Sequence, residues 1–403
     1  MDEKRECHTF EIKKEGMLDL LYKMVLLITF CFLLFFGLYL LFGKILKNEK
    51  LKNYLKARTL LGYAFIVFAV MYFIHWEFDL RDHSWWKAIS LNLVSYYIFA
   101  LLLELCFISL LDYRSFTKKK IREAIGKGGL FLLYISLFLW VENDSVCEKG
   151  LMFGALIFIL DVYYIVFRIF KAYKKALSGM NNYFSDDMDF IIRWFKNSIS
   201  AIILVGMSAP IITFTNKFLV TIHCFFMLFA FIYIFISFVN YGVVCSTVDF
   251  VFSDTDTSNE SIKIDEEEIT NTLSTDKNVI IDNRDKFNLI KISLDDWVVN
   301  KKFRIKSITI EQLATIIGTN RTYLSYYINS TFNCSFREWI TKLRIEDAKE
   351  LMLENPAMKI TKISEQVGFL SDSHFIRQFS ARENISPAKW REREIVLNTS
   401  KTV

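Results

Sequence analysis

The chain has 403 residues, of which 53% are hydrophobic and 39 are phenylalanine. This composition is too apolar for a wholly water-soluble protein of two or three domains, so we expect part of the chain to lie in a membrane. The formal net charge of +5 is distributed unevenly. Residues 1–244 contain 27 basic and 20 acidic residues, residues 245–284 contain 3 and 10, and residues 285–403 contain 19 and 14. We take these changes in charge as the domain boundaries.

The cysteines and histidines are few and scattered. Seven cysteines occur without a C-x-x-C pair, and none of the five histidines has a second candidate ligand at helical spacing. This distribution predicts neither a disulfide framework nor a metal site. We expect no metal and no cofactor.

Seven apolar segments in residues 1–244 are candidate membrane spans. The first is 19 residues long and uncharged, enough to cross a hydrocarbon core of about 30 Å at about 1.5 Å per residue. It has no small-residue cleavage site, so we interpret it as a retained span. The fourth segment is short, and whether it crosses is the open question. The segments are Met24–Phe42, Thr59–Trp76, Ala88–Leu111, Leu130–Val141, Gly150–Phe167, Ser198–Phe214 and Phe218–Val244.

The basic residues between these segments favour seven crossings. With seven spans, the loops 44–58, 112–128 and 168–197 lie on one side and each contain six basic residues. Lysine and arginine near the ends of spans stay in the cytoplasm, so these loops are expected to be cytoplasmic. If the fourth segment does not cross, the basic residues are distributed almost equally between the two sides of the membrane. The prediction is an N-terminus outside the inner membrane of a bacterium and a C-terminal domain in the cytoplasm.

Two carboxylates fall inside predicted spans. Glu104 and Asp161 are candidates for a functional polar site, because charged groups in the bilayer core are costly and seldom incidental. The alternative is that each accepts a hydrogen bond from a neighbouring helix and only fixes packing. From the sequence alone, we favour packing, since no second ionisable group forms an obvious relay with either.

Residues 245–284 are rich in serine, threonine, aspartate and asparagine. We find no sustained helical or alternating apolar pattern in this segment, and such a composition is typical of a flexible acidic linker. A coil of this length has an end-to-end distance of about 35 Å. It would hold a soluble domain clear of the lipid surface.

A helix-turn-helix pattern opens the C-terminal domain after a first amphipathic helix that includes Phe287 and Trp297. In the stretch IEQLATIIGTNRTYLSYYI, Ala314, Gly318 and Leu324 have the spacing of two helices that cross at a tight turn. Alanine permits close approach, glycine adopts the left-handed conformation of the turn, and leucine packs the second helix on the first.

The pattern returns about fifty residues later, in ISEQVGFLSDSHFIRQF. Gly368 matches Gly318, and after the turn the offset is 51, with Phe375 matching Leu324 and Trp390 matching Trp339. Two copies that keep register over about 30 residues indicate an internal repeat rather than a chance match. Between them, residues 335–354 predict a capped helix about 30 Å long. That approaches the ~34 Å between successive major grooves on one face of B-DNA.

These residues carry a family resemblance. The stretches LATIIGTNRTYLSYYIN, FREWITKLRIEDAKELM, ISEQVGFLSDSHFIRQF and SPAKWR resemble the DNA-binding domain of AraC/XylS-family transcription regulators over about residues 294–393. The chain differs from the usual pattern at Ser364, where alanine is common, and at Ala381–Arg382, where a lysine pair is common. The second change weakens a potential phosphate contact.

The resemblance implies two recognition helices that read DNA. The first would use Arg321, Thr322, Ser325 and Tyr326, and the second Asp372, Ser373, Ile376 and Arg377. The chemistry agrees for Arg377, since arginine forms bidentate contacts to guanine or binds phosphate. Asp372 is better suited to capping its helix, or to accepting from a cytosine amine, than to approaching phosphate.

The expected fold is therefore all-α: a multi-span transmembrane bundle (1–244), the linker (245–284) and a double helix-turn-helix domain (285–403). The expected function is a membrane-embedded transcription regulator and not an enzyme, because the known nucleotide-loop, zinc-protease, hydrolase and kinase motifs are missing from the sequence. Alternatives are a transporter or membrane enzyme with a regulatory DNA-binding tail, or spans that serve only as an anchor. Expected partners are double-stranded DNA, the lipid bilayer and RNA polymerase, with a second protomer and an unidentified ligand as further candidates.

Overall fold

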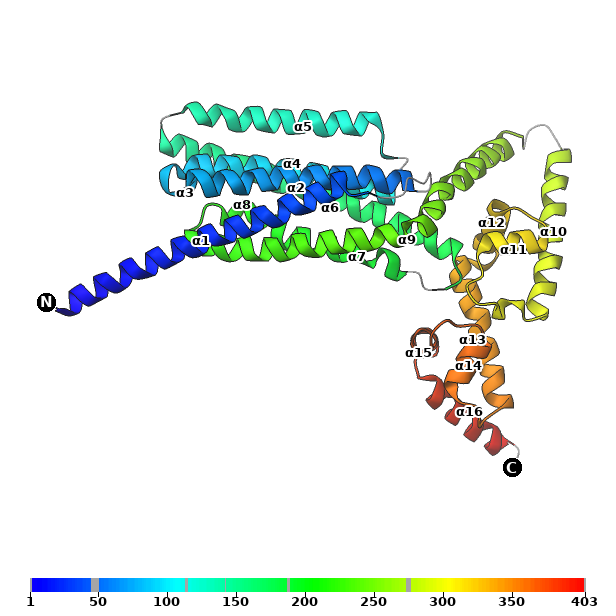
Figure 1. Cartoon of the computed structure of the whole chain (residues 1–403). Coiled ribbons are helices and arrows are strands. Elements are labelled where there is room, and N and C mark those ends of the chain that lie inside the picture. The colour runs from blue at the N-terminus through cyan, green and yellow to red at the C-terminus, as the bar shows by residue number, and fades with distance from the viewer. Residues whose placement is uncertain are drawn as a thin grey trace. The chain divides into compact units, whose positions relative to one another are not determined.

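A computed structural model describes residues 2–44, 51–112, 115–141, 143–186, 189–272 and 277–401. The described residues form helices and no strand, as the sequence predicts (Figure 1). They separate into two compact units. We call residues 1–176 with 191–252 the bundle, and residues 177–190 with 253–403 the C-terminal unit.

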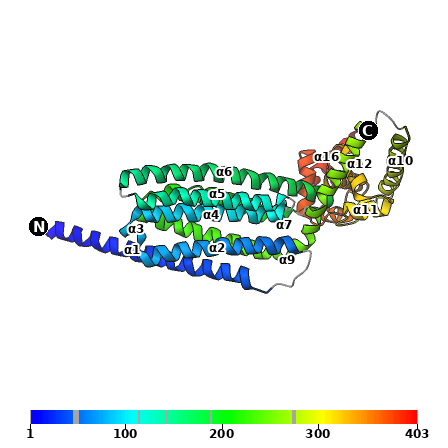
Figure 2. The same cartoon turned by 90° about the horizontal axis from the view of Figure 1, so that it is seen from above.

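Among the described residues, six helices are long and apolar enough to cross a membrane. The predicted fourth span (Leu130–Val141), short in the sequence pattern, lies, except for Val141, in a helical segment of 23 residues, Lys118–Trp140. In Figure 2 the helices of the bundle run side by side. The elements of this part of the chain are α1 (Asp2–Phe42), α2 (Lys52–Phe78), α3 (Leu80–His83), α4 (Trp85–Leu111), α5 (Lys118–Leu137), a 3₁₀ turn (Phe138–Trp140), α6 (Asp144–Tyr183), α7 (Asp189–Ala201), a π-helix (Ile202–Gly206), α8 (Ala209–Ile212) and α9 (Lys217–Thr272).

Polar contacts close one end of the bundle. The Lys217 ammonium at the start of α9 lies 2.7 Å from a carboxylate oxygen of Asp19 and 2.5 Å from one of Asp82. The Arg81 guanidinium donates to the carbonyl of Thr213 at 3.2 Å. The middle of α1, the short helix α3, the end of α8 and the start of α9 therefore meet at this end.

The predicted span 198–214 is not one continuous α-helix, and for that reason it is not among the six. It consists of the end of α7, the π-helix and α8, and α8 contains Pro210, which has no backbone N–H to donate. The ring centre of Phe195 in α7 lies 5.5 Å from that of Phe107, near the C-terminal end of α4, and 5.3 Å from that of Tyr241. The segment therefore runs from that end of the bundle to Thr213 at the other end, which makes it an interrupted seventh crossing of the bundle.

Phenylalanine fills the middle of the bundle. Phe68 lies with its ring 4.4 Å from Phe99 and 5.2 Å from Phe231, and Phe36 stacks on Phe235 at 4.0 Å. The outward faces are apolar as well, with large side chains such as Phe35, Leu133, Leu160, Phe226 and Phe229 at least 60% exposed. A protein that is apolar inside and outside has no surface suited to water over this region.

The segment 245–272, predicted to lack regular structure, is helical. It is part of α9, which continues without a break from Lys217 to Thr272. The expectation of irregular backbone is thus wrong for these residues, since the segment contains no glycine or proline to interrupt a helix. Residues 273–276 lie outside the described residues. The assignment of 245–284 as a separate connector stays a proposal.

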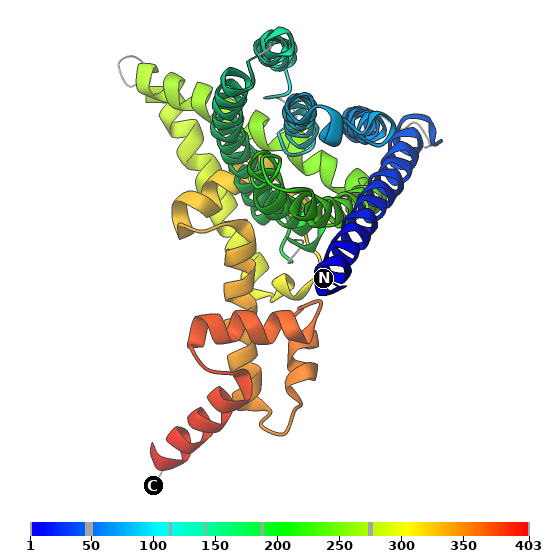
Figure 3. The same cartoon turned by 90° about the vertical axis from the view of Figure 1, so that its left-hand side faces the viewer.

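The C-terminal unit is built around one central helix, α13. Figure 3 shows this helix in orange, with the gold and yellow helices at one end and the red helices at the other. Its elements are α10 (Lys277–Val299), a 3₁₀ turn (Lys302–Arg304), α11 (Ile310–Ile317), α12 (Arg321–Phe332), α13 (Phe336–Glu354), α14 (Ile360–Gln366), α15 (Asp372–Glu383) and α16 (Pro387–Lys401). α13 has 19 residues and is therefore about 28 Å long.

The internal repeat is structural as well as sequential. Asn333 and Asn384, which are 51 residues apart, both end a helix in the left-handed conformation, with φ of 50° and 59°. Trp339 and Trp390 then occupy the fourth position of α13 and α16, and both are buried. The two tryptophans are in equivalent positions, as the repeat predicts.

The two turn glycines differ in their surroundings, although both have positive φ (76° at Gly318, 95° at Gly368). A Cβ on Gly318 would meet nothing within 4 Å, whereas one on Gly368 would lie 2.3 Å from the carbonyl oxygen of Arg304. The second turn is therefore packed directly against the backbone of the 3₁₀ turn that precedes the first helix-turn-helix.

Gly368→Ala is accordingly expected to destabilise the C-terminal unit much more than Gly318→Ala. The left-handed conformation costs both variants about 1–2 kcal/mol, and the clash with Arg304 raises the loss for Gly368→Ala to at least about 3 kcal/mol. Hydrogen exchange of α13 amides in the full-length protein in detergent measures both losses. Equal losses would contradict the close packing at Gly368.

Candidate nucleic-acid interface

Side-chain caps set the start of each helix in the first helix-turn-helix. Thr309 and Gln312 form a reciprocal capping box at α11, and the Asn320 side chain accepts from the backbone N–H of Tyr323 at 2.8 Å to start α12. Leu324 and Ile328 are fully buried on the inner face of α12. These two side chains turn that face of α12 toward the core of the C-terminal unit.

The second helix-turn-helix has the same construction. Ser371, rather than Asp372, caps α15 by accepting from the backbone N–H of His374 at 3.2 Å. The capping role suggested for Asp372 is therefore wrong, because Asp372 is the first residue inside the helix. Phe375 and Phe379 are fully buried and pack edge to face at 5.7 Å.

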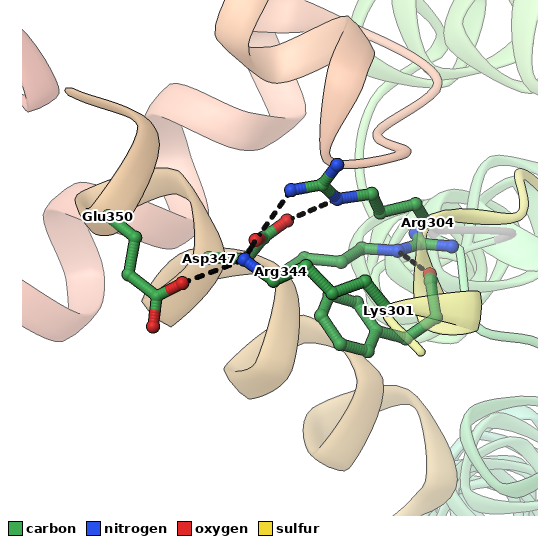
Figure 4. Close-up of polar contacts among 6 residues, drawn as sticks. Lys301, Arg304, Arg344, Asp347 and Glu350 are labelled. Carbon is green, nitrogen blue, oxygen red and sulfur yellow. Dashed lines mark hydrogen bonds and ion pairs between the residues drawn. The ribbon is translucent and has the colours of Figure 1, made fainter. Parts of the chain in front are cut away.

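A buried aspartate joins the 3₁₀ turn to α13. Asp347 accepts from Arg304 Nε at 2.6 Å and Nη2 at 2.7 Å, and from Lys301 Nζ at 2.8 Å (Figure 4). Lys301 also pairs with Glu350 at 2.8 Å. A bidentate arginine–carboxylate pair fixes both distance and orientation.

Burial alone would raise the pKa of Asp347. The hydrogen bonds and charges of Arg304 and Lys301 outweigh burial and hold this pKa below its ordinary range. The ionised form of Asp347 is therefore the form that the folded unit stabilises.

A buried arginine holds the same turn from the other side. Arg344 Nε donates to the carbonyl of Phe303 at 3.0 Å, and Nη2 donates to that of Ile305 at 2.8 Å. Its Nη1 pairs with Asp186 at 2.8 Å. Because Arg304 in this turn touches Gly368, these contacts fix the second helix-turn-helix relative to α13.

The predicted contacts of the first recognition helix lie on α12. Tyr326 is exposed, and its ring lies 5.8 Å from Phe287; the other three are half-buried. Arg321 is the first residue of the helix, and its guanidinium carbon lies 5.0 Å from the ring of Tyr183. The predicted residues are Arg321, Thr322, Ser325 and Tyr326.

On the second recognition helix, Ser373, Ile376 and Arg377 are exposed and Asp372 is half-buried. They share α15, with Ser373, Ile376 and Arg377 spaced three and four residues apart, so they form one outward face. The structure brings the predicted residues of each helix together on that helix.

Sequence reasoning missed a basic hollow beside α15. A cavity of about 800 Å³ opens between the start of α14 and the start of α15. Its lining includes three lysines (Lys306, Lys359 and Lys362), two carboxylates (Glu365 and Asp372) and the hydroxyls of Ser371 and Ser373. Glu365 pairs with Lys362 at 3.1 Å and lies 4.0 Å from Lys306, which partly offsets the charge. Lysines and hydroxyls around a helix N-terminus suit phosphate contacts.

The two carboxylates singled out in the bundle each have a cationic partner. Glu104 pairs with Arg168 at 2.9 Å, and Asp161 pairs with Lys127 at 2.6 Å and accepts from the Tyr97 hydroxyl at 2.8 Å. The sequence showed no obvious second ionisable group for either carboxylate, because these cations come from other helices. Two anions matched by two cations favour a packing role.

Comparison with known proteins agrees with this geometry. Residues 313–393 match the model of a family described as a helix-turn-helix domain. The C-terminal part of the chain is an AraC-type helix-turn-helix domain. This match includes both helix-turn-helix motifs, α13 and the start of α16.

Relatives of the AraC-type domain include several transcription regulators. The Msm operon regulatory protein of Streptococcus mutans is 31% identical over 86 residues, which are 21% of this chain and 31% of that protein. The lactose operon transcription activator of Staphylococcus xylosus is 28% identical over 93 residues, 23% of this chain and 33% of the relative. The probable transcription factor PqrA of Proteus vulgaris is 28% identical over 103 residues, 26% of this chain and 84% of the relative.

The chain spans only about a third of the length of the Streptococcus and Staphylococcus relatives. No solved structure is significantly similar to it. The relatives therefore identify the AraC-type domain and not the bundle.

The Asp347 contacts predict a pH-dependent loss of stability. At neutral pH, Asp347→Asn should lower the free energy of unfolding of the C-terminal unit by about 2–3 kcal/mol, because the amide cannot pair with Arg304 and Lys301. The pKa of Asp347 is lower in the folded state than in the unfolded state, where it is about 3.9. The stabilisation is thus complete above that value and is lost as pH falls through the folded pKa.

The difference in the free energy of unfolding between wild type and Asp347→Asn should therefore stay constant down to about pH 5 and become smaller below about pH 4. Hydrogen exchange of α13 amides in full-length protein checks this. Glu350→Gln is the matched control, because Glu350 is exposed and pairs with Lys301, one of the two cations that Asp347 binds. This substitution should lower the free energy of unfolding by less than about 0.5 kcal/mol. Equal losses in the two variants would be inconsistent with a special role for Asp347.

Proposed function

We propose that this chain is a membrane-embedded bacterial transcription regulator that binds promoter DNA in a sequence-specific manner through two helix-turn-helix motifs. The observation that carries the proposal is the duplicated motif on a single rigid helix. α13 is about 28 Å long, close to the ~34 Å repeat of the major groove. Its two ends therefore suit two recognition helices on one face of a duplex.

We propose Arg321, Thr322, Ser325 and Tyr326 as the contacts of α12, and Asp372, Ser373, Ile376 and Arg377 as those of α15. Arg377 has the strongest chemical case, since an exposed guanidinium on a recognition helix can form two hydrogen bonds to guanine. Lys306, Lys359 and Lys362 are added as phosphate contacts beside α15.

The bundle is proposed to span the cytoplasmic membrane with the N-terminus outside and the C-terminal unit in the cytoplasm. Its apolar outer faces, the six long helices and the interrupted seventh crossing support this placement. The 18 basic residues in the three loops expected inside support the orientation.

We propose the bundle as the signal input, and we assign no catalytic role. The polar cluster around Glu104 and Asp161 is internally neutralised, which gives no support to a transport pathway. An apolar cavity lies between Phe68, Tyr96 and Phe231, with a volume of about 60 Å³. Ligand pockets usually measure about 300–1,000 Å³. Input through a change in helix positions therefore fits the bundle better than a large ligand held in this cavity. RNA polymerase and a second protomer are further proposed partners.

The DNA-reading role predicts that Arg377→Ala weakens binding by about 10- to 100-fold, because one bidentate base contact contributes about 1–3 kcal/mol. The measurement uses the full-length protein in lipid nanodiscs and a duplex that the wild type selects from random-sequence DNA. Arg393→Ala is the matched control: Arg393 is an exposed arginine on α16 that pairs with Glu394, and its loss should change affinity less than about threefold. If Arg377→Ala binds the selected duplex as tightly as wild type, the assignment of α15 as the reading helix is wrong.

A further inference from the structure

A segment between two predicted spans belongs to the C-terminal unit. Residues 177–190 lie in the sequence between the apolar part of α6 and the crossing that begins with α7, yet they pack with residues 253–403. Phe184 forms an antiparallel β-bridge with Thr309, and the backbone N–H of Ser185 donates to the carbonyl of Ile308 at 3.2 Å. The segment thus pairs with the residues that lead into α11.

Asp186 anchors this segment. One carboxylate oxygen pairs with Arg344 at 2.8 Å, and the other accepts from the backbone N–H of Ser307 at 2.7 Å. The two charged side chains are only 1% and 2% exposed. Removing the carboxylate partner of a buried arginine strongly destabilises the folded state. The folded C-terminal unit is therefore stabilised by keeping Asp186 paired with Arg344.

Tyr183 contacts the first recognition helix. Its hydroxyl donates to the carboxylate of Glu311 at 2.7 Å, and its ring faces the guanidinium of Arg321 at 5.0 Å. Arg321 is the first residue of α12 and one of the proposed DNA contacts. A guanidinium stacked on a tyrosine ring is partly withdrawn from solvent and is held by a cation–π attraction.

We propose that residues 183–186 form a latch that competes with DNA for the first helix-turn-helix. This inference rests on the proposed DNA-binding function and concerns the control of that same site. The Tyr183 ring covers one face of the Arg321 guanidinium, and in this proposal Arg321 leaves the ring when it extends toward a base or phosphate. The latch therefore lowers DNA affinity while it is closed.

The latch has two parts with different roles. The contacts of Asp186 involve Arg344 and Ser307, which are not proposed DNA contacts, so this end can stay attached in both states. The Tyr183 end engages Arg321 and Glu311 and is the part that must open. Residues 184–188 are all that separates α6 from α7 in the sequence. A movement of α6 relative to α7 is thus transmitted to Tyr183 through the backbone. A ligand or signal increases DNA affinity only to the extent that it stabilises the open state, in which Tyr183 has left Arg321.

A reversible cross-link tests the latch directly. Phe184 and Thr309 are bridge partners, and paired residues of antiparallel backbone have Cα atoms about 4.5–5.5 Å apart, within the range of a disulfide. The double variant Phe184→Cys/Thr309→Cys, in full-length protein in nanodiscs, is oxidised and the cross-link is verified by peptide mapping. Its affinity for the duplex selected by wild type is then measured before and after reduction.

The oxidised form should bind at least about fivefold more weakly than the reduced form, and wild-type protein should not respond to oxidation. Tyr183→Ala should bind about fivefold more tightly than wild type, the size expected for one partly desolvated cation–π contact. Tyr183→Phe keeps the ring over Arg321 but loses the hydrogen bond to Glu311, so its DNA affinity should lie between those of wild type and Tyr183→Ala. Tyr163→Ala, an exposed tyrosine of α6 within the bundle, is the matched control and should bind as wild type.

The outcomes separate the latch from the proposed function. If oxidised and reduced forms of the cross-linkable variant bind DNA equally, or if Tyr183→Ala binds more weakly than wild type, the latch is overturned while DNA binding stands. If wild type enriches no duplex, the proposed function fails and the latch fails with it. A DNA affinity that falls on oxidation and recovers on reduction supports the latch. Binding by the reduced form also shows that the variant is folded.

Discussion

The spacing of the two helix-turn-helix motifs depends on a cluster of polar contacts that Asp347 and Arg344 of α13 make with the turn before α11. Asp347 holds Arg304 and Lys301, and Arg344 holds two carbonyls of the same turn. The carbonyl of Arg304 in turn meets Gly368, the glycine of the second motif. Apolar packing alone would let either motif slide along α13, because hydrophobic contact is not directional. Hydrogen bonds from fixed donors specify one position, and that position sets how far apart the recognition helices lie.

Ion pairs also join helices in the bundle, where the surroundings are mostly apolar. The exterior and core of the bundle are both apolar, and several of its charged groups pair with one another. Lys217, Asp19 and Asp82 gather at one end, and Glu104 and Asp161 each meet a cation inside. The interruption at Ile202–Gly206 leaves α7 and α8 less firmly tied than a continuous helix would be. π-helical turns within helices occur frequently at functional sites, and two residues separate residues 183–186 from the start of α7.

The sequence predicted the features that are local or repeated. Ala314, Gly318 and Leu324 have a fixed spacing because two crossing helices require it, and the second copy confirmed the register through Gly368 and Trp390. It did not predict contacts between residues far apart in the chain, such as Asp186 with Arg344, 158 residues away, because a single sequence contains no signal for such pairs. The same reason explains the missed partners of Glu104 and Asp161. The helical backbone of 245–272 was missed because polar composition was taken as evidence against a helix, although no residue there breaks one. Ser364 is buried where alanine is usual, and its hydroxyl has no hydrogen-bond partner among the described residues; nothing in the structure explains the serine.

The central claim is that one rigid helix presents two recognition helices to a single face of DNA from a membrane-held domain. The most direct measurement is a hydroxyl-radical footprint of the full-length protein in nanodiscs on the duplex it selects. The account predicts two protected segments on the same face of the duplex, centred about one helical turn, or 10–10.5 base pairs, apart. A single protected segment, or two segments on opposite faces, would contradict it.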